Sequence, residues 1–177
     1  MSGRRLIEVP DPALVVLVGA AGAGKSTFAA RQFQPGEVLS SDDFRARISG
    51  DPADQTASAA AFSALHRELS RRLRMGRLTV IDATSIQPHA RRALLARAAG
   101  ARVPAIAIVL ELPAALVLAR NAARPGRVVP EDAVRRQLAD LERTLAASRL
   151  EREGFVQIVR LTDPAEVDAV RVVRVRP

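Results

Sequence analysis

Continuous apolar runs alternate along the chain with amphipathic segments. Buried strands are predicted where polar residues are nearly absent, at Ala13 to Val18, Leu78 to Ile81 and Ala105 to Leu110, with a shorter strand at Glu37 to Leu39. Such runs are typical of parallel strands that are covered on both faces. Because helix-compatible sequence follows each run, the pattern predicts an α/β fold in which helices flank a parallel sheet.

The middle of the chain predicts one long helix preceded by a loop. Apolar residues recur at three- and four-residue spacing from Ala57 to Met75, which predicts an amphipathic helix that ends at Gly76. The segment Ser49 to Thr56 contains glycine, proline and aspartate, so we expect a mobile loop that borders the substrate site.

The end of the chain predicts two further strands. These are Phe155 to Leu161 and Val170 to Val175, with a turn over Pro164 to Val167 between them. Because the sequence has no internal repeat and no long linker, residues 1–177 are expected to form a single domain.

The composition and the N-terminal sequence bear on the kinds of stabilising site and on the cellular location expected for the protein. The chain has no cysteine, which excludes a disulfide framework and a thiolate metal site. Met1 to Pro12 contains no long apolar run, so neither a signal peptide nor a membrane span is predicted there. A cytoplasmic protein is expected.

The formal net charge of +8 comes almost wholly from arginine, since Lys25 is the only lysine. Such an excess attracts polyanions through salt-sensitive contacts and makes nucleic acid a reasonable partner. A composition rich in alanine and arginine explains the charge equally well, so charge alone does not identify a partner. Five phenylalanines without tyrosine or tryptophan argue against an extended base-stacking surface.

A glycine-rich motif lies between the first buried strand and a helix predicted over Ser26 to Phe33. Its spacing, a glycine, four residues and then Gly-Lys-Ser, is typical of the phosphate-binding loop (P-loop). In such a loop backbone N–H groups point at phosphate oxygens, the lysine bridges the β- and γ-phosphates, and the serine hydroxyl coordinates Mg²⁺. An incidental glycine turn would require strand, spacing and helix to coincide by chance. The predicted ATP-binding residues here are Gly19, Ala20, Ala21, Gly22, Ala23, Gly24, Lys25, Ser26 and Thr27.

Asp82 follows the strand Leu78 to Ile81, where P-loop proteins hold an acidic group that orients Mg²⁺ through water. The next residue is Ala83, whereas many motor and unwinding ATPases have a glutamate there that activates water. Its absence favours phosphoryl transfer to another acceptor over hydrolysis. Asp82 would also cap the turn that follows, a role that is compatible with the metal role.

A transferase needs a base beside the acceptor hydroxyl, and Asp42 and Asp43 follow the short strand at the carboxyl edge of the sheet. Asp42 is the candidate general base, and the alternative is that it caps the next helix. Arg45 lies three residues further on the same helix face, where it would hold an acceptor phosphate or keep Asp42 ionised.

Three arginines, Arg120, Arg124 and Arg127, lie at spacings of four and three where Pro125-Gly126 breaks a helix. We expect a lid, over about residues 113–145, whose guanidinium groups close over the transferring phosphoryl group. A solvated basic face is the alternative, but a small P-loop kinase requires a closing cationic element.

With these residues assembled, the chain resembles the kinase domain of bacterial polynucleotide kinase-phosphatase, the 5′-end-healing module of an RNA repair enzyme. The resemblance covers nearly the whole chain. It implies an adenylate-kinase-like P-loop NTPase fold with an arginine-bearing lid, and ATP or another nucleoside triphosphate, together with Mg²⁺, as cofactors. The segments that carry it are Leu14 to Gly19, Gly24 to Ala29, Glu37 to Asp42, Leu78 to Thr84 and Arg152 to Phe155.

The resemblance also implies roles for single residues. In that family the aspartate of the Ser-Ser-Asp segment is the general base and the arginine three residues later touches the acceptor, which places these roles on Asp42 and Arg45. The family's lid motif, Arg-Asn-x-x-Arg-x-x-Arg, is found from Arg120 to Arg127. An acceptor contact is implied for Gln55, which stands in the family's Asp-Gln pair.

The sequence departs from the family at two positions. Asp43 stands where related sequences have an aromatic residue, and Ser85 replaces the asparagine that usually follows Asp-Ala-Thr. Family members usually carry phosphatase and ligase domains after the kinase. Such domains of a longer protein are therefore expected partners, unless the kinase is free-standing.

The sequence thus predicts a kinase that transfers the γ-phosphate of ATP to the 5′-hydroxyl end of RNA or DNA. The predicted catalytic residues are Lys25, Asp42, Arg45, Arg120 and Arg124. The same chemistry on a small acceptor, such as a nucleoside, sugar or antibiotic, is the first alternative. A nucleotide-dependent nucleic-acid binder without transfer is the second, and intact Lys25 and Asp42 argue against it. No catalytic role is predicted for His66 or His89.

Overall fold

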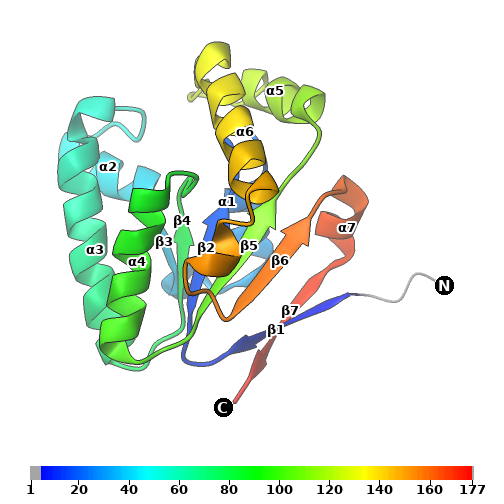
Figure 1. Cartoon of the computed structure of the whole chain (residues 1–177). Coiled ribbons are helices and arrows are strands. Elements are labelled where there is room, and N and C mark those ends of the chain that lie inside the picture. The colour runs from blue at the N-terminus through cyan, green and yellow to red at the C-terminus, as the bar shows by residue number, and fades with distance from the viewer. Residues whose placement is uncertain (1–4, 177) are drawn as a thin grey trace.

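The core of the protein is a five-stranded sheet whose strands all run parallel, in the order β3-β4-β2-β5-β6 (Figure 1). The computed structural model describes residues 5–176; residues 1–4 and 177, at the ends of the expected single domain, lie outside the described residues. The strands are β2 (Leu14–Val18), β3 (Val38–Ser40), β4 (Thr79–Asp82), β5 (Ala105–Leu110) and β6 (Gln157–Leu161). The predicted α/β fold with a parallel sheet is confirmed.

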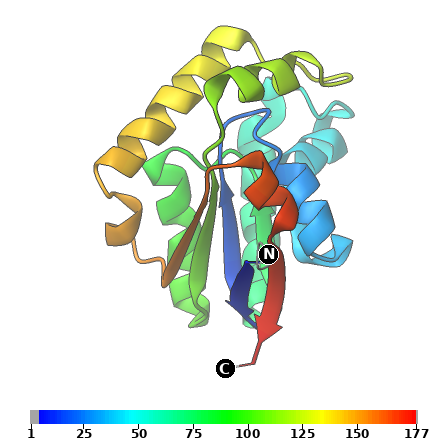
Figure 2. The ribbon, with the colours of Figure 1, turned by 90° about the vertical axis from the view of Figure 1, so that its right-hand side faces the viewer.

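Helices lie on both sides of the sheet, and α5 and α6 extend over the edge at which its strands end (Figure 1 and Figure 2). The α-helices are α1 (Lys25–Gln32), α2 (Ser41–Ser49), α3 (Ser58–Arg74), α4 (Pro88–Ala101), α5 (Ala114–Ala122), α6 (Glu131–Ala146) and α7 (Pro164–Ala169). Among residues 5–176, the 3-10 turns that connect them to their neighbours are η1 (Pro35–Glu37), η2 (Gln55–Ala57) and η3 (Leu150–Arg152).

The central strand β2 places the P-loop. All side chains of β2 and β5 are buried, because helices cover both faces of the sheet at these strands. β2 pairs with β4 on one side and β5 on the other; the chain that leaves β2 crosses to β3, whereas the chain that leaves β5 crosses to β6 in the opposite direction. Ligands of open α/β sheets bind at such a reversal, beyond the carboxyl ends of the strands.

The chain termini form a second, two-stranded sheet that the sequence pattern did not predict. β1 (Leu6–Pro10) pairs in parallel with β7 (Arg171–Val175), so the predicted last strand lies outside the main sheet. The turn predicted over Pro164 to Val167 is wrong, because α7 begins there. Asp163 caps this helix by accepting a hydrogen bond from the Ala165 N–H at 2.6 Å, and a proline at the first position is compatible with a helix start.

The other predicted elements are found within one or two residues of their expected bounds. α3 ends one residue before Met75, and Gly76 follows with a positive φ of 64° that suits glycine at a helix end. Across residues 5–176, no helix combines the length and apolar character needed to span a membrane.

Candidate active site

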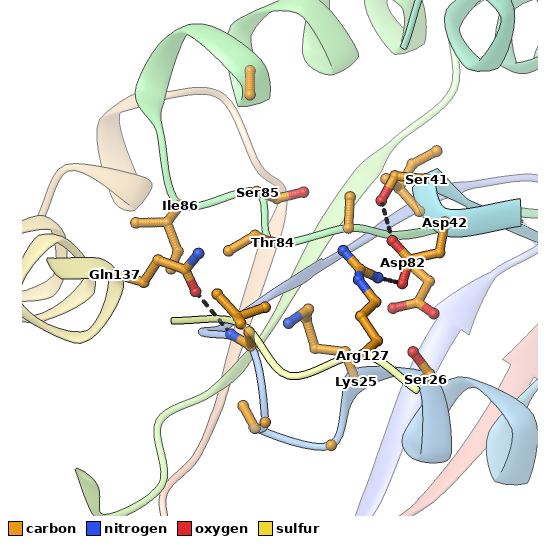
Figure 3. Close-up of a pocket in the computed structure, with 18 of the residues that line it drawn as sticks. Lys25, Ser26, Ser41, Asp42, Asp82, Thr84, Ser85, Ile86, Arg127 and Gln137 are labelled. Atoms are coloured by element: carbon orange, nitrogen blue, oxygen red, sulfur yellow. Dashed lines mark hydrogen bonds and ion pairs between the residues drawn. The ribbon is translucent and has the colours of Figure 1, made fainter. Parts of the chain in front are cut away.

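A large cavity opens beyond the carboxyl ends of the strands, between the P-loop and the helices α5 and α6. Its volume of about 1260 Å³ exceeds the roughly 300–1,000 Å³ of ordinary small-molecule pockets. Its walls come from the P-loop, α2, the first turns of α3 and α4, the loop after β4, and the segment between α5 and α6. In Figure 3, Lys25, Ser26, Asp42 and Arg127 converge on this space.

Lys25 is the first residue of α1, and its side chain turns back onto the loop that precedes it. Its Nζ donates hydrogen bonds to the carbonyl oxygens of Gly19 at 2.8 Å and Ala20 at 2.9 Å. These two residues lie outside the lining of the cavity, whereas Ala21 to Thr27 all line it. Gly19 and Ala20 therefore hold the lysine, and the rest of the predicted loop faces the ligand space.

The tight turn of the loop depends on two glycines in the left-handed region, Gly22 (φ 88°) and Gly24 (φ 92°). A Cβ on Gly22 would lie 2.4 Å from the backbone oxygen of Val117 and 3.0 Å from the backbone nitrogen of Asn121, both in α5. Gly22 thus lets the P-loop pack directly against the backbone of the predicted lid. A Cβ on Gly24 would meet only the Arg120 guanidinium, at 3.7 Å.

Gly22→Ala is expected to lower the free energy of unfolding by about 2 to 5 kcal/mol, because a left-handed conformation and an immovable backbone contact add together. Chemical denaturation measures this change. Gly36→Ala is the matched control, since the structure places nothing within 4 Å of its added Cβ. Equal stability of the two variants would contradict the contact between Gly22 and α5.

The electrostatic environment of Lys25 changes its protonation. Burial lowers the pKa of its ammonium group to about 8; the carboxylate of Asp82 opposes this shift, and the positive charges of Arg124 and Arg127 add to it. Only the protonated form has the charge that attracts phosphates, and phosphates in turn stabilise that charge. A bound phosphate would therefore raise the pKa of Lys25.

ATP affinity is consequently expected to depend on pH. Above pH 8 the unliganded lysine is neutral, so binding must first take up a proton and the dissociation constant should rise about tenfold per pH unit. Calorimetric titration between pH 7 and 9.5 measures this slope. The Lys25→Arg variant, whose guanidinium stays charged, is the control and should show a flat profile. A flat wild-type profile would contradict the assignment of Lys25 to phosphate.

Asp42 lies in the first turn of α2 and is paired with two arginines. Arg45, on the next turn, and Arg127, from the predicted lid, bind opposite oxygens of its carboxylate. Arg45 is only 5% exposed and also donates from Nε to the carbonyl oxygen of Pro52 at 3.0 Å. The arrangement joins α2 to the lid through one carboxylate (Figure 3).

The structure separates the two candidate aspartates. Asp42 lines the cavity, whereas Asp43 is exposed and does not line it. The alternative role of Asp42 as helix cap is not observed, because Ser40 is the N-cap of α2 and accepts from the Asp43 N–H at 3.4 Å. Of the two aspartates, Asp42 is therefore the one that faces the cavity.

Ser26 and Asp82 both line the cavity on the P-loop side, as a magnesium site requires. Asp82 is 8% exposed at the end of β4 and acts electrostatically on Lys25. Residues 5–176 hold no cluster of three or more metal-ligating side chains. This donor set suits Mg²⁺ that is bound together with nucleotide phosphates, because such sites need only one or two protein ligands.

All three predicted lid arginines, Arg120, Arg124 and Arg127, line the cavity. Asn121, between them in sequence, is 3% exposed; its Nδ2 donates to the carbonyl oxygen of Val129 at 2.7 Å, and its Oδ1 accepts from the Val129 N–H at 3.2 Å. This amide closes the loop between α5 and α6 at its base. It thereby fixes the segment that carries Arg124 and Arg127.

Sequence reasoning missed several residues of the site. The Oε1 of Gln137, on α6, accepts a hydrogen bond from the P-loop N–H of Ala21 at 2.9 Å, and its neighbour Asp140 accepts one from Gln87 at 2.9 Å. Arg91, fully buried in α4, holds the loop after β4 by donating to the carbonyl oxygen of Ser85 at 3.0 Å. The one sequence signal for Arg91 is its position as a charged residue on the apolar face of a helix.

One further predicted residue, Gln55, lines the cavity. Gln55, in η2, lines the cavity with an exposed side chain, next to Ala53 of the loop predicted to border the site. His66 is half-buried on α3 and His89 lies in the first turn of α4, and both line the cavity. An acceptor contact of Gln55 stays a prediction.

Known structures share this fold. A chain of the Pnkp1/Rnl/Hen1 RNA repair complex is 23% identical with a TM-score of 0.67, over 78% of this chain and 47% of its own length, so the protein spans about half of that chain. A gluconokinase from Sinorhizobium meliloti 1021 is 19% identical, with a TM-score of 0.56, and covers 90% of this chain and 89% of its own. Shikimate kinase from Acinetobacter baumannii is 24% identical, with a TM-score of 0.51, and covers 89% of this chain and 88% of its own.

No curated protein matches the chain. A family model described as an AAA domain matches residues 14–148, from the first strand of the main sheet through the lid. The protein therefore belongs to this AAA domain family and has the P-loop fold of kinases.

Proposed function

We propose that the protein is a polynucleotide 5′-hydroxyl kinase that transfers the γ-phosphoryl group of ATP to the 5′ end of RNA or DNA in end healing. One observation carries the proposal: Asp42, paired with the lid residue Arg127, lies in the same cavity as the P-loop lysine. A base, a closing cation and a phosphate-binding loop are the three parts that phosphoryl transfer requires.

In the proposed reaction Asp42 accepts the proton of the acceptor hydroxyl while the oxygen of that hydroxyl attacks the γ-phosphorus. The bond from this phosphorus to the β–γ bridging oxygen breaks, and ADP leaves with that electron pair. Lys25 and the lid arginines stabilise the negative charge on the phosphoryl oxygens. Mg²⁺, when bound, would neutralise phosphate charge at Ser26 and, through water, Asp82.

Two observations support a polynucleotide as the acceptor. The net charge of +8 attracts polyanions. The chain of the Pnkp1/Rnl/Hen1 RNA repair complex has a similar fold, with a TM-score of 0.67 to this protein. A small-molecule acceptor is the second candidate, because the gluconokinase and the shikimate kinase match over nearly their full length. Association with phosphatase and ligase domains of a longer protein is part of the first proposal.

The test is label transfer from γ-labelled ATP, with Mg²⁺, to a short 5′-hydroxyl oligoribonucleotide and its DNA counterpart. A parallel set contains nucleosides, gluconate and shikimate. Transfer to an oligonucleotide supports the proposal. The rates of transfer to RNA and to DNA then show which of the two acceptors is preferred. Transfer to a small acceptor alone would overturn it in favour of the second candidate.

A further inference from the structure

A second hollow, of about 760 Å³, runs along α3 on the outside of the molecule, and α4 contributes Arg97 to its lining. The two helices lie side by side and both begin at the edge of the active-site cavity (Figure 1). Phe62 and His66 line both hollows. We call this second hollow the α3–α4 groove; it continues the active-site cavity along α3.

The α3–α4 groove is basic. Arg67, Arg71, Arg74 and Arg97 line it, and its lining contains no carboxylate. Arg71 is paired with Glu68 at 2.8 Å. Within the described residues 5–176, no carboxylate forms an ion pair with Arg67, Arg74 or Arg97. Three positive charges therefore face a continuous surface without a compensating protein anion.

Two aromatic rings stand where the groove meets the active site. The Phe62 and His66 rings are 6.3 Å apart between centroids and inclined at 50°. Burial, and secondarily the charge of Arg97, lower the pKa of His66 and so favour the uncharged form of its imidazole. Neutral rings of this kind accept stacked nucleobases irrespective of base identity.

Resting on the polynucleotide kinase function proposed above, we propose that the α3–α4 groove binds the acceptor strand downstream of its 5′ end. Phe62 and His66 stack the first bases, and Arg67, Arg74 and Arg97 bind the following phosphates. Arginine is suited to this role because its guanidinium donates two parallel hydrogen bonds to phosphate.

The geometry sets the length of strand that is bound. Phe62 and Arg74 are separated by about 18 Å along α3, at 1.5 Å of rise per residue. A stacked strand rises about 3.4 Å per nucleotide, so this span corresponds to about five nucleotides. The KM for the acceptor is expected to fall as it grows from one to about five nucleotides and to stay constant beyond.

The triple variant Arg67→Ala/Arg74→Ala/Arg97→Ala tests the assignment. It should bind a 3′-labelled 5′-hydroxyl decamer about 100-fold more weakly at 0.1 M salt, with a salt slope lower by about 2, because each single-strand phosphate contact contributes about 0.7 to that slope. Its KM for a nucleoside 3′-monophosphate should match that of the wild type. Phe62→Leu, which keeps an apolar side chain, should weaken decamer binding about tenfold.

The matched control is Arg77→Ala/Arg92→Ala/Arg149→Ala. It removes the same charge from exposed positions that line neither hollow. If both triple variants lost the same affinity for the decamer, net charge alone would explain the loss, and the groove assignment would be overturned. A wild type that phosphorylates the decamer with no length dependence would also overturn it and leave the proposed function intact. A wild type that phosphorylates only small acceptors would overturn the proposed function itself.

Discussion

Asp42→Asn is expected to lower the rate of phosphoryl transfer by about 10³-fold, because a positioned general base contributes roughly 10² to 10⁴. The amide keeps the size of the side chain and one acceptor oxygen for Arg45 and Arg127, but it cannot take the proton of the acceptor hydroxyl. Single-turnover label transfer measures the loss. ATP affinity should change little, since Asp42 lies on α2 and the nucleotide phosphates are expected at the P-loop.

Asp43→Asn is the matched control for this experiment and should retain nearly full activity, because its exposed side chain does not line the cavity. Removal of Asp42 charge leaves the buried Arg45 without its ion pair, so thermal unfolding must be compared. A folded Asp42→Asn protein with wild-type turnover would exclude Asp42 as the base. Loss of activity only in Asp43→Asn would move that role to its neighbour.

The parts of the fold that the sequence predicted are those that depend on local pattern. β2 and β5 are unbroken apolar runs, and the P-loop spacing between β2 and α1 follows from the backbone conformation that phosphate binding needs. The pairing of β1 with β7 depends instead on strands at opposite ends of the chain. Edge pairing over such a separation has no local signature, because register and partner are set only in the folded state.

The candidate site shows the same division. Asp42, Arg45 and the lid arginines were found from spacing within single segments, and the structure brings them to one cavity. The ion pair of Asp42 with Arg127 and the hydrogen bond of Gln137 to the P-loop were not predicted, because each joins segments that meet only through folding of the lid. Such contacts need the relative positions of elements, which no periodicity encodes.

The pairing of Arg127 with the proposed base has a consequence for the lid. In the structure the Arg127 guanidinium forms an ion pair with the carboxylate of Asp42. Arg124 makes no ion pair among residues 5–176, yet its charge acts on Lys25. Of the two, Arg124 is therefore the arginine that we expect to contact the transferring phosphoryl group, while we expect Arg127 to position the proposed base.

Arg124→Ala is accordingly expected to lower kcat by about 10³-fold, within the range found for arginines that stabilise phosphoryl transfer. Arg124→Lys should recover only part of this, because an ammonium cannot form the paired hydrogen bonds of a guanidinium. Arg135→Ala, an exposed position on α6 paired with Glu131, is the control and should leave kcat unchanged. Rapid-quench measurement with saturating ATP and acceptor gives these rates.

A second measurement separates a catalytic role of Arg124 from a structural one. Because its positive charge helps lower the pKa of Lys25, Arg124→Ala should raise that pKa above about 8 and move the pH at which ATP affinity begins to fall toward higher values. A lid that had come apart would also raise the pKa of Lys25, by exposing it, but it would in addition weaken ATP binding at every pH, including pH 7. Unchanged kcat together with an unchanged pH profile would place Arg124 outside the reaction, and the cationic part of the lid would then reduce to Arg120 and Arg127.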